Sequence, residues 1–176
     1  MNIIDLSIDK LPAYPPYVTA KDHGLVEAGI IPLCDALVKL GASPISSCEG
    51  HALLGLKSGS KVIDFFVSLF AEERRNWNRP FVVFTASLET AAAIHHAIQA
   101  IPQWSFDHSQ RKSTFVWDVE GHFMEGSKLA WKITTNDYRL SSGSNWVEGD
   151  IKQSVTLLQN DIILIAQILE GLVNRR

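Results

Sequence analysis

The sequence concentrates its reactive side chains in one short segment, residues 46–51, which runs Ser-Ser-Cys-Glu-Gly-His. A thiol, a carboxylate and an imidazole lie within this segment, directly after a short extended run. A thiolate forms at neutral pH only beside a base or a cation, so Cys48 and His51 have the residue types of a nucleophile and its base. The candidate catalytic residues are therefore Cys48, Glu49 and His51.

The same side chains are also of the types that zinc accepts, because this metal binds thiolate, imidazole and carboxylate ligands together. His95 or His96 would have to complete such a site, and successive helical residues point about 100° apart, so only one of them could face it. The sequence has no second cysteine or histidine pair at zinc-ligand spacing. No metal ligand is therefore predicted, and a Cys-dependent or metal-dependent hydrolase remains an alternative.

A third interpretation treats the segment as a binding pocket. Strand ends followed by glycine turns expose backbone donors, and the two serine hydroxyls add further donors. Glu49 offers an acceptor for a ribose or an amine, and His51 offers a donor or an acceptor. We therefore expect a pocket for a small polar, nucleotide-like ligand. The first alternative is an enzyme that uses the same side chains, and the second is a protein-interaction module without a ligand. The predicted ligand-binding residues are Ser46, Ser47, Cys48, Glu49, Gly50 and His51.

Composition narrows the class of protein. The chain has 176 residues, a net charge of −3 and 46% hydrophobic residues, which fits one globular domain with a substantial core. Mild acidity argues against a nucleic-acid partner, because such proteins carry a basic face. We expect a cytoplasmic protein with no membrane partner: the first residues do not resemble a signal peptide, and two cysteines make no disulfide framework. The oligomeric state stays open.

The elements that position the candidate segment follow from proline, glycine and apolar periodicity. Residues 1–22 contain several prolines, which remove backbone donors, so an irregular N-terminal arm is predicted. Apolar residues at helical spacing then predict a helix from about His23, capped by Asp22, to Gly41. Pro32 either kinks this helix or begins a second one. The candidate segment follows as a short strand and a loop.

Further elements follow the same rules. The charge-free run Phe81–Thr85 suits a central strand buried on both faces, and Ser87 or Thr85 can cap the helix after it. The other predicted elements are helices at 62–75, 88–101 and 151–173, strands at 114–120 and 128–134 joined by a hairpin connection at 121–126, and a loop at 138–149. We predict a single α+β domain over residues 1–176, with a mixed β-sheet covered by helices and a long C-terminal helix.

The candidate segment resembles a signature of the wybutosine-synthesising tRNA methyltransferases, in the family of the third enzyme of that pathway. In that family a helix precedes a strand that ends in Ser-Ser-Cys-small-Gly-Arg. The matching positions are Ser46, Ser47, Cys48 and Gly50. Glu49 stands in place of the small residue and His51 in place of the arginine.

The resemblance extends from about Gly24 to the C-terminus and implies a following buried strand, a helix, a β-hairpin and a C-terminal helix. It also implies S-adenosylmethionine as the methyl donor and tRNA as the substrate. We take from it the fold and the position of a pocket, and keep a methyltransferase-like enzyme as an alternative. From the residues themselves no cofactor is predicted, and whether the protein catalyses a reaction stays open.

Overall fold

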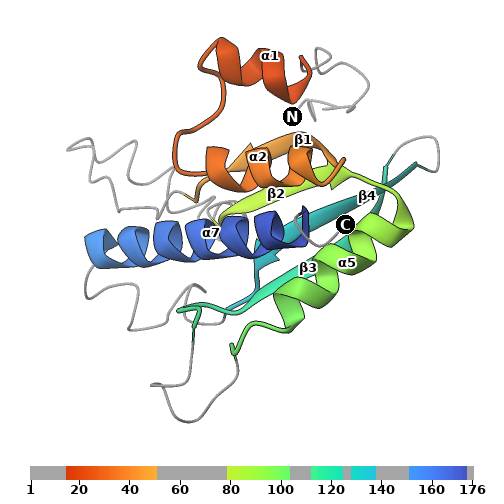
Figure 1. Cartoon of the computed structure of the whole chain (residues 1–176). Coiled ribbons are helices and arrows are strands. Elements are labelled where there is room, and N and C mark those ends of the chain that lie inside the picture. The colour runs from red at the N-terminus through yellow and green to blue at the C-terminus, as the bar shows by residue number, and fades with distance from the viewer. Residues whose placement is uncertain (1–14, 51–78, 104–111, 125–127, 138–150, 174–176) are drawn as a thin grey trace, which may run out of the picture.

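Four short segments of the described part of the chain pair into one sheet with the strand order β1-β2-β4-β3 (Figure 1). In this computed structural model the described residues are 15–50, 79–103, 112–124, 128–137 and 151–173. The strands are β1 (Ser43–Cys48), β2 (Phe81–Thr85), β3 (Trp117–Met124) and β4 (Lys128–Thr135). The central position predicted for Phe81–Thr85 is confirmed, because β2 pairs with both β1 and β4.

The predicted mixed sheet is wrong for the described strands, because all three pairings are antiparallel. Burial along β2 also alternates: Val82 and Phe84 are fully buried, while the residues between them are half-buried. A run of uncharged β-forming residues therefore did not require burial on both faces. Such a run does not specify the direction of its neighbours either, since antiparallel and parallel ladders accept the same side chains.

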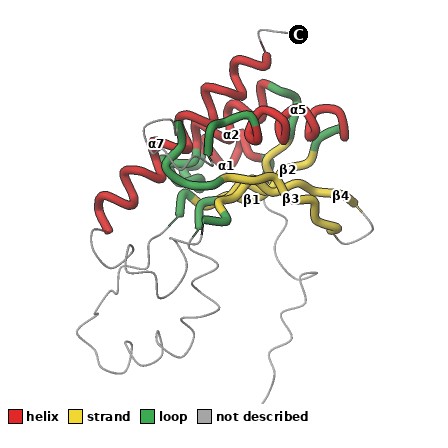
Figure 2. Tube along the Cα trace, turned by 90° about the horizontal axis from the view of Figure 1, so that it is seen from below, coloured by secondary structure: helices red, strands yellow, loops and turns green. Residues whose placement is uncertain are grey.

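Helices cover one face of the sheet, and Figure 2 shows them on the same side of the strands. The described helices are α1 (Tyr17–Asp22), α2 (Ile31–Lys39), α5 (Leu88–Gln99) and α7 (Ile151–Val173). The α+β class and the long C-terminal helix are thereby confirmed. Ser87 caps α5 as predicted, since its hydroxyl accepts a hydrogen bond from the Thr90 N–H at 3.1 Å.

The irregular arm predicted for residues 1–22 is wrong over its last part, where Tyr17–Asp22 forms α1. Pro16 precedes this helix in extended backbone, with φ −50° and ψ 147°. A proline is tolerated there, because the first amides of a helix have no partner within the helix. The prolines directly before α1 therefore led to the prediction of an irregular segment where a helix forms.

The helix predicted from His23 to Gly41 begins later, at Ile31, and Pro32 lies in its first turn. Of the two roles considered for Pro32, the start of a helix is the correct one. Asp22 ends α1 rather than capping a helix that begins after it. Gly41 follows the last turn with φ +81°, the left-handed conformation that glycine adopts after a helix end.

The core lies between the sheet and the helices. Its largest fully buried side chains include Trp117, Phe84, Phe115, Ile133, Ile162 and Leu169. The segment Val155–Val173 of α7 is long and apolar enough, by length and composition alone, to cross a membrane. The core helix of a globular protein passes the same test, and α7 buries a stripe of apolar side chains in this core.

A buried carboxylate fastens α7 to the chain around the start of β3. Asp161 is 2% exposed, and it accepts hydrogen bonds from the backbone N–H groups of Thr114 and Phe115 and from the indole of Trp117. Burial raises the pKa of Asp161, and the three donors act in the opposite direction.

These donors occupy the predicted strand 114–120, but the strand itself begins at Trp117 and continues to Met124, through part of the predicted connection 121–126. The helix at 62–75 and the loop at 138–149 lie outside the described residues.

Candidate functional site

The predicted segment ends an edge strand of the sheet. β1 pairs only with β2 among the described strands, and it places Ser47 opposite the fully buried Val82. Ser47 therefore faces the helix layer, where it hydrogen-bonds the thiol of Cys34 on α2. Its neighbours Ser46 and Cys48 belong to the other face of the sheet. Ser46, Ser47 and Cys48 are thus divided between the two faces of the sheet rather than directed into one site.

The two cysteines differ in their surroundings. Cys34 is fully buried, and this burial raises the pKa of its thiol to about 12, so a thiolate is disfavoured there. Cys48 is half-buried at the end of β1, and its Sγ accepts a contact from the Gly50 N–H at 3.4 Å. Gly50 has φ +86°, which turns the chain directly after the strand. His51 lies outside the described residues, so its pairing with Cys48 stays a prediction.

Glu49 joins the turn after β1 to the loop between α1 and α2. Its Oε2 accepts a hydrogen bond from the Gly29 N–H at 2.6 Å. Its own N–H donates to Oε2 of Glu27 at 2.7 Å. Hydrogen bonds to carboxylates are stronger than neutral ones, so the pair of contacts fixes both the backbone and the side chain of Glu49.

Gly29 provides the room for this contact. A Cβ added at Gly29 would lie 2.5 Å from Oε2 of Glu49 and 3.3 Å from its Cβ, closer than the carboxylate could tolerate. Glu27 and Gly29 were not among the predicted site residues; they lie 22 and 20 residues before Glu49 and inside the segment predicted as a helix. A glycine within a helical pattern was the available signal, since it often marks a special packing requirement.

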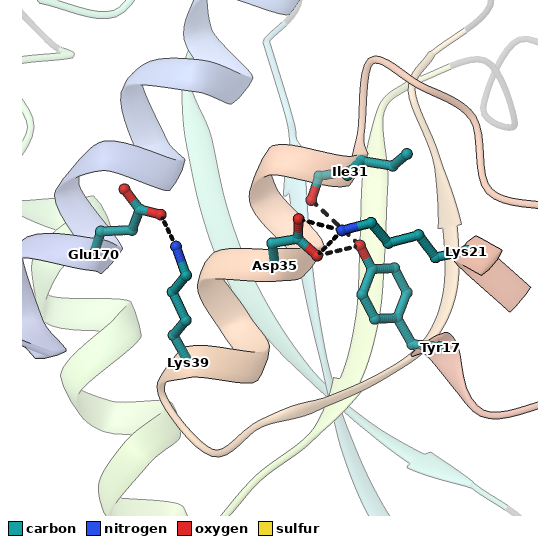
Figure 3. A network of polar contacts seen from close by, with 6 residues as sticks. All are labelled: Tyr17, Lys21, Ile31, Asp35, Lys39 and Glu170. Atoms are coloured by element: carbon teal, nitrogen blue, oxygen red, sulfur yellow. Dashed lines mark hydrogen bonds and ion pairs between the residues drawn. The ribbon is translucent and has the colours of Figure 1, made fainter. Parts of the chain in front are cut away.

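The loop that holds Glu49 is bordered by two helices, which Asp35 fastens together (Figure 3). Lys21 of α1 donates to both oxygens of Asp35, at 2.8 and 2.6 Å, and the Tyr17 hydroxyl donates to Oδ1 at 2.8 Å. Burial alone would raise the pKa of Asp35, but the bonds from Lys21 and Tyr17 outweigh it, and the pKa is lowered. Both ends of the loop carrying Glu27 and Gly29 are therefore attached to ordered helices.

The histidines proposed to complete a metal site lie elsewhere. His95 Nε2 is 3.9 Å from Oδ1 of Asp118 on β3, the edge of the sheet opposite β1, and His96 is exposed on the same helix. Neither can complete a shell with Cys48 and Glu49, so that part of the metal alternative is wrong. Within the described residues, no group of three His, Cys, Asp or Glu side chains could hold a metal ion.

No relative of known function assigns a role to these residues, so their chemistry alone supports the interpretation of the site. The chain matches no protein-family model, no curated protein and no solved structure.

Proposed function

We propose that the turn after β1 binds a small polar, nucleotide-like ligand, with Glu49 as the principal acceptor. The observation that carries the proposal is the way in which Glu49 is held. Its carboxylate and its backbone N–H are both bonded to the loop at Glu27–Gly29, so the acceptor is positioned before a ligand arrives. Positioned groups improve affinity because less ordering is needed on binding.

The chemistry of these groups suggests which end of a nucleotide they would contact. A carboxylate is an acceptor with about four lone-pair sites, so the one bond from Gly29 leaves capacity for ligand hydroxyl or amino groups. Glu27 brings a second carboxylate to the same turn. Two acidic groups favour a ribose or an amine over a phosphate, which would be repelled. The ligand class is therefore one rich in hydrogen-bond donors, such as a nucleoside or a nucleotide that presents its sugar.

The surroundings of Glu49 agree with a binding role. Cys48 and Glu49 are half-buried rather than fully solvated, and Gly50 is buried, although all three belong to a polar turn at a strand end. Partly desolvated polar groups beside apolar strands are typical of small-molecule sites. The resemblance to the methyltransferase signature also centres on this turn, which supports the same location independently of the geometry.

The test measures binding to the intact chain by isothermal calorimetry and by thermal shift. The ligands are adenosine, guanosine, their mono- and triphosphates, and S-adenosylmethionine. Saturation at 100 times the dissociation constant adds about 2.7 kcal/mol to the free energy of unfolding, which is readily seen as a rise in Tm. Glu49→Gln keeps an oxygen for the Gly29 N–H but removes the charge, so ligand affinity should fall about tenfold or more.

Glu89→Gln, on an exposed position of α5, is the matched control and should bind the ligand as the wild type does. The dissociation constant is compared rather than Tm alone, because Glu49→Gln also changes the stability of the free protein. If none of these compounds binds, or if Glu49→Gln binds equally well, the proposal is wrong.

A further inference from the structure

The second half of β3 forms an exposed edge of the sheet. β3 pairs with β4 on one side, and no described strand pairs with its other side. Exposure increases along it: Gly121, His122, Phe123 and Met124 are all exposed, and Phe123 reaches 84%. Exposed sheet edges are templates for pairing with another strand, and here the exposed Phe123 lies beside Leu129 of β4, which is also exposed.

The hydrogen bonds of Trp117 show which backbone groups point outward. Its N–H donates to Oε1 of Gln103, and its carbonyl accepts from Nε2 of Gln103 at 3.2 Å, so both point away from β4. Because these directions alternate along an antiparallel strand without a register shift, the groups of Val119, Gly121 and Phe123 also point outward. The Val119 N–H is occupied by Oδ1 of Asp118 at 2.7 Å.

We propose that β3 of a second copy of this chain pairs antiparallel with this edge, about a two-fold axis through Gly121. Gly121 then faces Gly121 of the second copy, and Val119 faces Phe123 in both directions. Gly121 contributes two interchain backbone hydrogen bonds, and the Phe123 N–H donates to the Val119 carbonyl twice. In this pairing Oδ1 of Asp118, which also accepts from Nε2 of Gln99 at 2.9 Å, moves away from the Val119 N–H, and that N–H donates to the Phe123 carbonyl of the second copy.

Side-chain complementarity selects this register. With Gly121 on the axis, Glu120 of each copy faces His122 of the other, and the exposed Phe123 packs between Leu129 of its own chain and Val119 of the second copy. A register centred on residue 120 would place two glutamates opposite each other, and one centred on residue 122 would place two histidines opposite each other. Two carboxylates that face each other on paired strands repel, and two facing histidines would lose the contacts between Glu120 and His122.

The carboxylate of Glu120 is already held in position for this contact. Asn136 donates to its Oε1 at 2.7 Å, and this bond, with smaller effects of Lys132 and His122, lowers the pKa of Glu120. Oε2 lies 3.3 Å from Nε2 of His122 in the same chain. The two residues would form a symmetric cluster of two glutamates and two histidines across the axis. This self-complementarity is why the occupant is a second copy, since a two-fold interface pairs one patch with itself.

The mass of the intact protein in solution is the first test, measured by sedimentation over a concentration series up to about 1 mM, where even weak association is seen. We expect concentration-dependent growth from 19.5 kDa toward twice that mass. Phe123→Lys should weaken the dimer about tenfold or more, because the symmetry removes two apolar contacts at once. Leu88→Lys, at an apolar position that is 71% exposed on α5, should leave it unchanged. A monomer at every concentration overturns the proposal, as does a dimer unaffected by Phe123→Lys.

Cysteine crosslinking tests the register. Facing residues of a non-hydrogen-bonded pair have Cα atoms about 4.5 Å apart, within the range that a disulfide spans. An equimolar mixture of Glu120→Cys and His122→Cys should therefore form a crosslinked dimer under mild oxidation. Each variant alone should crosslink no more than the wild type, which contains only Cys34 and Cys48. Faster crosslinking of either variant alone than of the mixture would contradict the register.

Discussion

Gly29→Ala tests the contact that holds the candidate site together. The added Cβ would lie 2.5 Å from Oε2 of Glu49, so the carboxylate has to move and its 2.6 Å bond to the Gly29 N–H is lost. The backbone of Gly29 is not in the left-handed region, where only Gly24, Gly41 and Gly50 lie among the described glycines. Alanine therefore causes no backbone strain, and the effect reports on Glu49.

The expected change in the free energy of unfolding is the difference between the lost hydrogen bond and the stabilisation that alanine brings by restricting the unfolded chain. A hydrogen bond to a charged group contributes about 1.5–3 kcal/mol, and Glu49 is half-buried, so water replaces part of the bond and the lower end applies. Replacing glycine by alanine restricts the unfolded chain and returns about 0.4–1 kcal/mol. Gly29→Ala should therefore lower the free energy of unfolding by about 1 kcal/mol. Gly171→Ala, with no atom within 4 Å of its added Cβ, should raise it instead by about 0.5–1 kcal/mol.

Urea unfolding followed by tryptophan fluorescence provides the measurement, and a double-mutant cycle assigns the cause. In a Glu49→Ala background there is no carboxylate to displace and only the Cβ of residue 49, 3.3 Å from the added Cβ, remains nearby, so Gly29→Ala should become close to neutral. The coupling energy between the two positions should then be at least about 1 kcal/mol. Equal destabilisation by Gly29→Ala in both backgrounds would refute the reasoning, because the loss would then have another cause.

Two further predictions concern the scaffold. Asp161→Ala leaves three N–H donors without their acceptor and should cost about 3–5 kcal/mol in urea unfolding, whereas Asn160→Ala at an exposed neighbouring position should change stability by less than about 0.5 kcal/mol. A cost below about 1 kcal/mol for Asp161→Ala would contradict the buried clamp. Burial raises the pKa of Asp35, but the bonds from Lys21 and Tyr17 give a net lowering. The free energy of unfolding of the wild type should therefore exceed that of Asp35→Asn at pH values above the unfolded-state pKa of about 3.9. This difference should disappear as the pH falls through the pKa of Asp35 in the folded protein. A difference that does not depend on pH would exclude this role.

Local sequence features determined the elements whose signals are contained within a few residues. The stripe of apolar residues over 151–173 predicted α7 with its observed bounds, because amphipathic periodicity specifies a helix and its buried face together. Ser87 and Gly41 marked the start of α5 and the end of α2, since a capping hydroxyl and a left-handed glycine act on the nearest turn. The end of β1 at residues 46–48 was predicted from the same kind of local evidence.

Tertiary structure decided which distant residues meet. Glu27 and Gly29 reach Glu49 only because α1, the following loop and α2 return the chain to the end of β1. No local signal assigned His95 to one edge of the sheet or the other, and the order β1-β2-β4-β3 placed it beside Asp118, away from Cys48. Strand direction was equally undetermined, because residue types describe the environment of a strand and not the course of the chain between strands. The candidate segment was therefore visible in the sequence, whereas the contacts that position its carboxylate depend on the fold.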